Sequence, residues 1–235
     1  MRELTFTLEY EPDANPVMDV LIDNPEVTAH ALGSCASRDQ LWFVERFSGP
    51  PNELDRIEQI RFDDDQKERM TRSTCGATRH HDVLESTPGS RVFYTYLREV
   101  HRCDSVVGNA ARYLDLGMIF QSYRRDAFHT WRLLIRSEEN VDTFFETVDD
   151  HLRDNITLHL DRLCEAKGWD IDSLSTVSVT EPQRKALQIA VERGYYESPR
   201  ETTIEELASE LDIPSSTLSY RLRRAEAELA NGFIA

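Results

Sequence analysis

The chain has 235 residues and is strongly acidic, with 43 aspartates and glutamates against 27 lysines and arginines and a formal net charge of −16. Because domains usually hold ~100–200 residues, this length predicts one large domain or two smaller ones. No run approaches the ~18 apolar residues that span a membrane, and the first residues lack the apolar segment of a secretory signal. We therefore expect a cytoplasmic protein without membrane contact.

The basic residues are unevenly divided between the two types. Lysine occurs only as Lys67, Lys167 and Lys185, so 24 of the 27 basic residues are arginine. A carboxylate-rich surface keeps a protein in solution where salt screens the ordinary repulsion between charges. This composition predicts a host with a salt-rich cytoplasm, an extreme halophile. The alternative explanation is an acidic protein that avoids nucleic acid.

Strand and helix patterns alternate along the first part of the chain. Leu4, Phe6, Leu8 and Tyr10 alternate with polar residues, which is typical of a half-buried strand. The patterns that follow predict, in order, a helix over 17–22, a hairpin of 27–35 and 41–47, a helix from 50–52 onward and a strand over 78–84. The segment 63–81 fits this plan poorly. We interpret its run Asp63-Asp64-Asp65 as a solvated acidic segment rather than a cation site.

The same order of elements then recurs. The sequence predicts a strand over 92–97, a helix over 105–114, a hairpin of 116–123 and 128–135, a helix capped by Ser137 and a closing strand over 155–163. The apolar stripe of the last helix contains Val141, Phe144, Phe145 and Val148. As an alternative, 155–163 could extend that helix. A βαββαβ plan that occurs twice predicts a tandem ferredoxin-like arrangement, which sensory domains of the ACT type share.

A change of composition marks the end of this region. The segment 167–170, Lys-Gly-Trp-Asp, closes it, and the polar stretch 172–178 is rich in serine and threonine, as linkers are. We predict an α+β chain with three parts: a tandem ferredoxin-like or ACT-like sensor or dimerisation domain over 1–168, a linker over 169–179 and an all-α helix-turn-helix domain over 180–235.

The first two helices of the C-terminal domain have clear end signals. Thr180 caps the first helix, with Gln183 three residues later, and Gly194 ends it. Thr202 or Thr203 caps the second helix, whose apolar residues are Ile204, Leu207, Ala208 and Leu211. The segment 212–214 is predicted to be the tight turn that follows.

The third helix carries the residue types of a DNA-reading helix. Ser215 or Ser216 caps it, and its buried stripe is Leu218, Leu222, Ala225 and Leu229. Hydroxyl side chains near its start allow close entry into the major groove, and arginines further along reach guanine edges or phosphates. The residues that face outward are Ser216, Thr217, Tyr220, Arg221 and Arg224, with Arg223 beside them. The alternative is a three-helix interaction module with solvated arginines.

The C-terminal sequence also has a recognisable family pattern. The strings ERGYY, PRETTIEELA and STLSYRLRR, within residues 179–230, resemble the helix-turn-helix of the bacterio-opsin activator family of halophilic archaea, which is itself similar to the DNA-reading region of sigma factors. The resemblance implies a transcription regulator that contacts DNA from Ser215 through Arg224, Ser219 included. The N-terminal region resembles, less closely, the domain that accompanies this helix-turn-helix in the family. Because that resemblance rests on the order of elements and on the closing junction, it implies no particular ligand or signal.

The charge of the C-terminal domain is unusual for a DNA binder. Residues 180–235 hold ten acidic and seven basic residues, a net charge of −3. Binding would then depend on the local cluster of Arg221, Arg223 and Arg224. Since one such module reads few base pairs, we expect a homodimer on double-stranded DNA, with the exposed edges of the sheet as one dimer contact. A small-molecule effector is a further expected partner.

Cysteine and histidine residues are the remaining candidates for chemistry. Four cysteines, Cys35, Cys75, Cys103 and Cys164, are scattered without a CxxC pair, so we expect them to be reduced and separately buried. The residues that could form a metal site or a thiol redox sensor are Cys75, His80, His81, His101 and Cys103. Their spacing matches no standard ligand motif, so we expect no metal and no cofactor.

Other functions find less support in the sequence. Phosphate-binding and nucleophile motifs are absent and the chain has only nine glycines, so we do not expect an enzyme. The aromatic residues Tyr94, Tyr96, Tyr123, Phe128 and Trp131 are interpreted as sheet core, with a small-molecule pocket as the alternative. Two rival functions remain: a metal- or thiol-based redox-sensing regulator, and an adaptor that contacts the transcription machinery rather than DNA.

Overall fold

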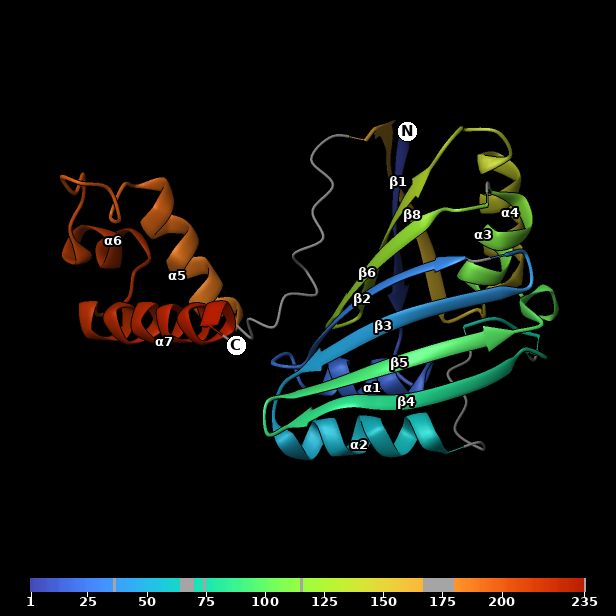
Figure 1. Ribbon diagram of the computed structural model, residues 1–235, viewed down its shortest axis with the longest axis horizontal. Helices are drawn as coiled ribbons and strands as arrows, with labels where there is room; N and C mark the ends of the chain where they lie inside the picture. Colours follow the sequence, from blue (N-terminus) through green and yellow to red (C-terminus); the bar gives the residue numbers. More distant parts are fainter. Residues whose placement is uncertain (36, 64–69, 74, 115, 167–179, 235) are drawn as a thin grey trace. The chain divides into compact units, whose positions relative to one another are not determined.

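The computed structural model describes residues 1–35, 37–63, 70–73, 75–114, 116–166 and 180–234 (Figure 1). Contacts divide the chain into two compact units, Met1–Leu174 and Ser175–Ala235, and each is described by itself below. The linker expected over 169–179 lies outside the described residues, as do Asp64 and Asp65 of the acidic run. Among the described helices, none has the length and apolar character needed to cross a membrane.

The N-terminal unit is α+β, and its elements follow the order predicted from the sequence. They are β1 (Arg2–Tyr10), α1 (Pro16–Asp23), β2 (Thr28–Cys35), β3 (Gln40–Ser48), α2 (Pro51–Phe62), β4 (Thr78–Thr87), β5 (Ser90–Arg98), the short 3-10 helix η1 (Val100–Arg102), α3 (Val106–Tyr113), β6 (Ile119–Arg125), β7 (Phe128–Ile135), α4 (Val141–His151) and β8 (Ile156–Glu165). The closing segment is a strand, so the alternative of a longer last helix is wrong.

The start of α4 differs from the prediction. Its N-terminal cap is Asn140, which has a left-handed backbone (φ 61°), and not Ser137. Residues 138–141 form a turn closed by the Val141 amide donating to the Glu138 carbonyl over 3.2 Å. The first helical hydrogen bond therefore runs from Phe144 to Asn140, and Ser137 lies one turn too early to cap the helix.

The eight strands form one continuous antiparallel sheet in the order β4-β5-β3-β2-β6-β7-β1-β8. The two βαββαβ repeats do not form separate sheets. Instead β1 lies between β7 and β8 of the second repeat, whereas β5 lies between β3 and β4 of the first. Each half of the sheet thus contains the first strand of the other repeat, and the halves join where β2 pairs with β6.

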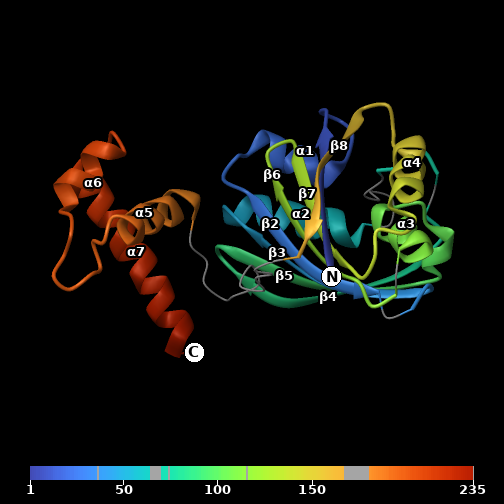
Figure 2. The ribbon, with the colours of Figure 1, turned by 90° about the horizontal axis from the view of Figure 1, so that it is seen from above.

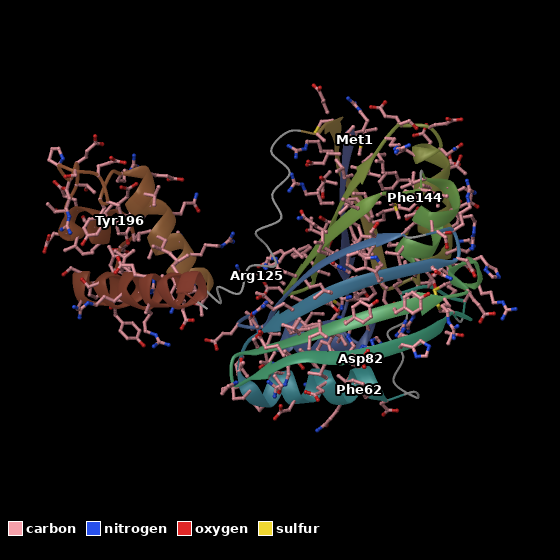
Figure 3. All side chains as sticks on the ribbon, viewed as in Figure 1. Met1, Phe62, Asp82, Arg125, Phe144 and Tyr196 are labelled. Carbon is pink, nitrogen blue, oxygen red and sulfur yellow. A yellow bond between two sulfur atoms is a disulfide. The ribbon has the colours of Figure 1, made fainter. Side chains whose placement is uncertain are left out.

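Two clusters of apolar residues lie between the helices and one face of the sheet. Leu4, Phe6 and Leu8 of β1 are fully buried beneath α3 and α4. The ring of Phe144, which is labelled on α4 in Figure 3, meets that of Phe6 edge-on at 5.9 Å. On the other half, α1 and α2 pack over Phe47 and Phe93, whose rings also meet edge-on at 5.9 Å. Burial of each such ring contributes about 1.5–3 kcal/mol.

The helices α1–α4 all cover the same face of the sheet, so within the described part of the N-terminal unit the opposite face carries no helix (Figure 2). Alternation along the strands places Tyr94, Tyr96, Tyr123 and Phe128 on this free face and Trp131 on the helix side. The prediction of a common aromatic core is therefore wrong except for Trp131. Phe128, for example, is 46% exposed because its register with Arg125 turns it away from the helices.

A charged cluster is buried beneath the helices near the middle of the sheet. Glu45 is only 1% exposed and forms ion pairs with Arg61 and, over 3.4 Å, with Arg124. The Arg124 Nε donates to Nε2 of His129 over 3.4 Å. Burial, together with the positive charges of Arg124 and Arg61, lowers the pKa of His129 well below its usual range, so this histidine is neutral.

Two of the four cysteines are joined, which corrects the prediction that all are reduced and separate. Cys75 and Cys103 form a disulfide across a sequence separation of 28 residues, with Cα atoms 4.3 Å apart. The segment around Cys75 runs beside η1, where the Gly76 amide donates to the Arg102 carbonyl over 3.0 Å, and this pairing brings the two sulfur atoms together. Cys35 is a free, buried thiol as expected, and burial raises its pKa to about 12.

Candidate nucleic-acid interface

The C-terminal unit consists of the helices α5 (Glu181–Glu192), α6 (Ile204–Glu210) and α7 (Ser215–Ile234). The predicted start signals are confirmed, since Thr180 with Gln183 and Thr203 with Glu206 each form a reciprocal capping box. Gly194 follows α5 with φ +69°, a backbone conformation that residues with a side chain rarely adopt, so the predicted end of this helix is also confirmed.

Small residues allow these helices to pack closely. The buried core of the unit is made of Ala186, Ala190, Leu207, Ala208, Leu218 and Leu222, none more than 3% exposed. Ala225 continues the stripe on α7 and is fully buried. Leu229 was predicted to end the stripe but is 43% exposed, so the burial of α7 ends about one turn earlier.

A tight turn fixes α7 against α6. The Ile213 amide donates to the Ala208 carbonyl over 3.0 Å, and the Thr217 amide donates to the Pro214 carbonyl over 2.9 Å. Asp212 between them has φ 52°, a left-handed conformation that aspartate tolerates better than most residues. These bonds hold the first turn of α7 in place relative to the rest of the unit.

One side of α7 is exposed over its first three turns. Tyr220 is 65% exposed, and Ser215, Ser216, Arg223 and Arg224 are also exposed. The predicted residues Thr217, Ser219 and Arg221 are half-buried. With 3.6 residues per turn, the side chains that lie opposite the buried stripe are Ser216, Tyr220, Arg223 and Arg224, and we call these four the reading face.

Two acidic side chains of α6, Glu206 and Glu210, are engaged in contacts away from the reading face. Glu206 accepts hydrogen bonds from the Thr203 amide and from Thr202, which lower its pKa. Glu210 is paired with Arg193, which lowers the pKa of Glu210. On the reading face itself, Arg224 has a weak contact, 3.9 Å, with Glu228 one turn on.

Sequence reasoning missed the part played by the two adjacent tyrosines after α5. The Tyr196 hydroxyl donates to Glu226 of α7 over 2.6 Å, while the Arg200 guanidinium lies 4.6 Å from the ring centre of Tyr195. Burial and the bond to Glu226 raise the pKa of Tyr196, which remains a donor. Their presence in the motif ERGYY was the available signal, but it did not identify the partner on α7.

The candidate metal or thiol residues of the N-terminal unit do not converge on one site. His81 Nδ1 contacts Thr95, His101 Nδ1 contacts Asp39, and His80 stacks near Tyr96. Within the described ranges, no group of three or more histidine, cysteine, aspartate or glutamate residues is arranged to hold a metal ion. Only Cys75 and Cys103 meet, as the disulfide.

The arrangement of α5, α6 and α7 defines the class of this unit as a helix-turn-helix. In agreement, residues 179–231 match the HTH DNA-binding domain family HTH_10, which confirms the family resemblance found in the sequence. Residues 3–169 match the HVO_2928_N family of N-terminal domains. This second match covers more than half of the 235 residues, and the chain belongs to that family.

Two curated relatives match the C-terminal part. One is a dimethyl sulfoxide reductase transcriptional activator of Haloferax volcanii, 53% identical over 53 residues, which are 23% of this chain and 25% of the relative. The other has the same name, comes from Halobacterium salinarum and is 40% identical over 58 residues, which are 25% of this chain and 26% of the relative. The chain thus spans about a quarter of the length of these relatives. Both come from halophilic archaea, in agreement with the acidic, lysine-poor composition.

Proposed function

We propose that this protein is a DNA-binding transcription regulator in which α7 reads promoter DNA. The observation that carries the proposal is the reading face, where Tyr220, Arg223 and Arg224 project from a helix whose opposite side is anchored in the core. An α-helix fits the major groove, which is ~12 Å wide. The match to a DNA-binding family and the relatives named transcriptional activators support the same function.

The residues of α7 would have different tasks on DNA. Ser215 and Ser216 lie at the helix start, where hydroxyl groups contact phosphates and fix the register of the protein on the duplex. Arg223 and Arg224 are long enough to reach guanine edges or the backbone, and Tyr220 offers both a ring and a hydroxyl. Thr217, Ser219 and Arg221 are half-buried and would contact the groove walls from the side.

The N-terminal unit would be the sensory or interaction part of the regulator. The strand order, in which each half of the sheet contains the first strand of the other repeat, supports a description as two ferredoxin-like, ACT-like halves. We assign it to 1–168, the linker to 169–179 and the DNA-binding domain to 180–235. In this proposal the protein works in the cytoplasm as a homodimer, responds to a small-molecule effector and catalyses no reaction.

The test is binding to the protein's own promoter region in molar salt. Wild type is compared with the Arg223→Ala/Arg224→Ala variant, and Arg193→Ala, which removes an exposed arginine paired with Glu210, is the control. Each base contact contributes ~1–3 kcal/mol, so the double variant should bind at least tenfold more weakly while the control binds normally. Equal binding by all three proteins would refute DNA reading by α7. Intact regulation without any DNA binding would favour the adaptor function.

A thiol-based redox-sensing regulator is the second candidate, and the Cys75–Cys103 disulfide favours it. In this function, reduction would release the segment before β4 from η1 and change the affinity for DNA. The same promoter assay, repeated with and without a thiol reductant, separates the two functions. A Cys75→Ser/Cys103→Ser variant controls for direct effects of the reductant, because it should not respond.

A further inference from the structure

We infer that the helix-free face of the N-terminal sheet is the interface through which two copies of this chain form a dimer. The free face comprises the strand positions that point away from α1–α4. Its apolar and aromatic members are Leu32, Trp42, Val44, Val92, Tyr94, Tyr96, Ile119, Tyr123, Phe128 and Leu134. The inference takes from the proposed function only the need for a dimer.

The strand register places these side chains in one layer. Tyr96 of β5 pairs with Trp42 of β3, and Tyr94 pairs with Val44, which in turn pairs with Leu32 of β2. All of these residues are half-buried by one another, so the layer is packed before any partner arrives. Its side chains would therefore lose little further conformational entropy when a partner binds, and such a loss is one of the main costs of association.

The charge of the free face differs from that of the whole chain. Its strand positions carry five arginines and, with the bulged Asp161 that accepts a hydrogen bond from Thr7, five carboxylates, whereas the chain has a net charge of −16. Because this face is neutral, a second copy of this acidic protein can approach it without net repulsion. The balance of five arginines and five carboxylates favours self-association over docking of a strongly acidic partner.

Three of the five arginines of the free face are paired with carboxylates of the same face. Glu3 accepts hydrogen bonds from Arg132 and Arg162, each over 2.8 Å, and Arg46 contacts Glu85 over 3.4 Å. An aromatic sheet that binds single-stranded nucleic acid needs free cations along the phosphate backbone. Because these three arginines already have carboxylate partners, a protein surface fits the face better than a nucleic acid.

The size of the free face matches that of a stable dimer interface. Eight strands spaced ~4.8 Å apart and seven or more residues long, with ~3.3 Å per residue, cover roughly 800 Å². A standard protein interface buries about 800 Å² on each partner. Two such faces would pack as the two sheets of a sandwich do, ~10 Å apart, and a twofold axis would pass near the β2–β6 junction at the centre.

The test is sedimentation of the full chain in molar potassium chloride over a range of concentrations. Wild type should be a dimer at micromolar concentration. Leu32→Arg places like charges beside the twofold axis and should raise the dimer dissociation constant at least hundredfold. Leu116→Arg changes a similarly apolar residue, 46% exposed and outside the strands of the sheet, and should remain dimeric.

A second variant covers the case in which Leu32→Arg fails to fold. Leu32→Thr introduces a smaller, β-branched side chain that is suited to a strand, and it should raise the dissociation constant about tenfold with an unchanged circular dichroism spectrum. Wild type that stays monomeric, or a Leu32→Thr variant that dimerises as wild type does, would overturn the inference. Binding of a single-stranded oligonucleotide that Leu32→Thr weakens, with no dimer, would assign the face to nucleic acid instead.

The outcome is separable from that of the proposed function. A wild-type dimer that binds no promoter DNA would leave the interface in place and remove the DNA-reading function. Promoter binding by a monomer would do the reverse. Dimers of equal strength in wild type and both Leu32 variants would show that the copies associate through another surface.

Discussion

His129 on β7 accepts a hydrogen bond from Arg124 on β6 across the middle of the sheet, with 3.4 Å between Nε2 and Nε. The two residues are direct cross-strand partners, and both are buried, with exposures of 1% and 8%. A protonated imidazole would place a second positive charge beside the arginine. The contact therefore requires a neutral histidine, which makes it sensitive to pH.

The stability of the N-terminal unit should fall as the pH is lowered below about 6.5, the ordinary pKa of histidine. In this range the unfolded chain binds a proton at His129 and the folded chain does not, because burial lowers the folded pKa. The free energy of unfolding should decrease by at most about 1.4 kcal/mol per pH unit from this one group. Denaturant unfolding between pH 7.5 and 5, followed by tryptophan fluorescence, measures the slope.

The variants His129→Gln and His80→Gln test the assignment of this slope. Glutamine keeps an acceptor for Arg124 and cannot be protonated, so the slope should become shallower in His129→Gln. His80 is exposed, and its variant should retain the wild-type slope. Hydrogen bonds from Arg132 and Arg162 lower the pKa of Glu3. Its contribution to the free energy of unfolding is therefore lost only as the pH falls below about 4.5, outside the range of this measurement.

Removal of Glu45 should strongly destabilise the N-terminal unit. It is the carboxylate that Arg61 and Arg124 share in the interior, so Glu45→Ala leaves two buried arginines without this partner. Breaking a buried ion pair in this way costs about 3–5 kcal/mol. Glu85→Ala removes the more exposed partner of Arg46 and should cost below about 1 kcal/mol. Equal unfolding midpoints for the two variants would contradict the buried role of Glu45.

Local signals in the sequence predicted the elements well, because caps and apolar periodicity act within a few residues. The boxes at Thr180 and Thr203 and the stop at Gly194 all lie where the pattern placed them. Strand exchange could not be predicted in this way. The periodicity of β1 shows which of its faces is buried, but not that β7 and β8 are its neighbours.

The errors have the same physical origin. Tyr94 and Phe128 were predicted to be core because aromatic residues favour burial, yet cross-strand register decides which face each one occupies. The Cys75–Cys103 bridge depends on a loop that returns beside η1 from 28 residues away. On α7, where the local pattern is sufficient, Tyr220, Arg223 and Arg224 are exposed as the sequence indicated, while their contact with DNA stays a prediction.

Loss of the cap of α6 should weaken the C-terminal unit. The Thr203 side chain accepts a hydrogen bond from the Glu206 amide over 3.3 Å, and Thr203→Ala removes it at a cost of about 0.5–2 kcal/mol. Ser209→Ala changes an exposed position inside the same helix and serves as control. All three tryptophans precede residue 180, so tryptophan fluorescence does not report on unfolding of the C-terminal unit. Circular dichroism reports on both units, and the part of its change that fluorescence does not follow is the unfolding of the C-terminal unit. A larger effect of Ser209→Ala would contradict the capping role.

The disulfide should contribute to the stability of the N-terminal unit through the unfolded chain. A bridge that closes a loop of 28 residues removes conformational freedom from that state and contributes about 3–4 kcal/mol in the loop-entropy description. Cys75→Ser/Cys103→Ser should lower the free energy of unfolding by this amount, and the reductant should then have no further effect. Cys164→Ser removes a half-buried free thiol and is the matched control. Wild type that unfolds at the same denaturant concentration with and without reductant would show that the bridge does not stabilise the unit, and it would weaken the redox-sensing function at the same time.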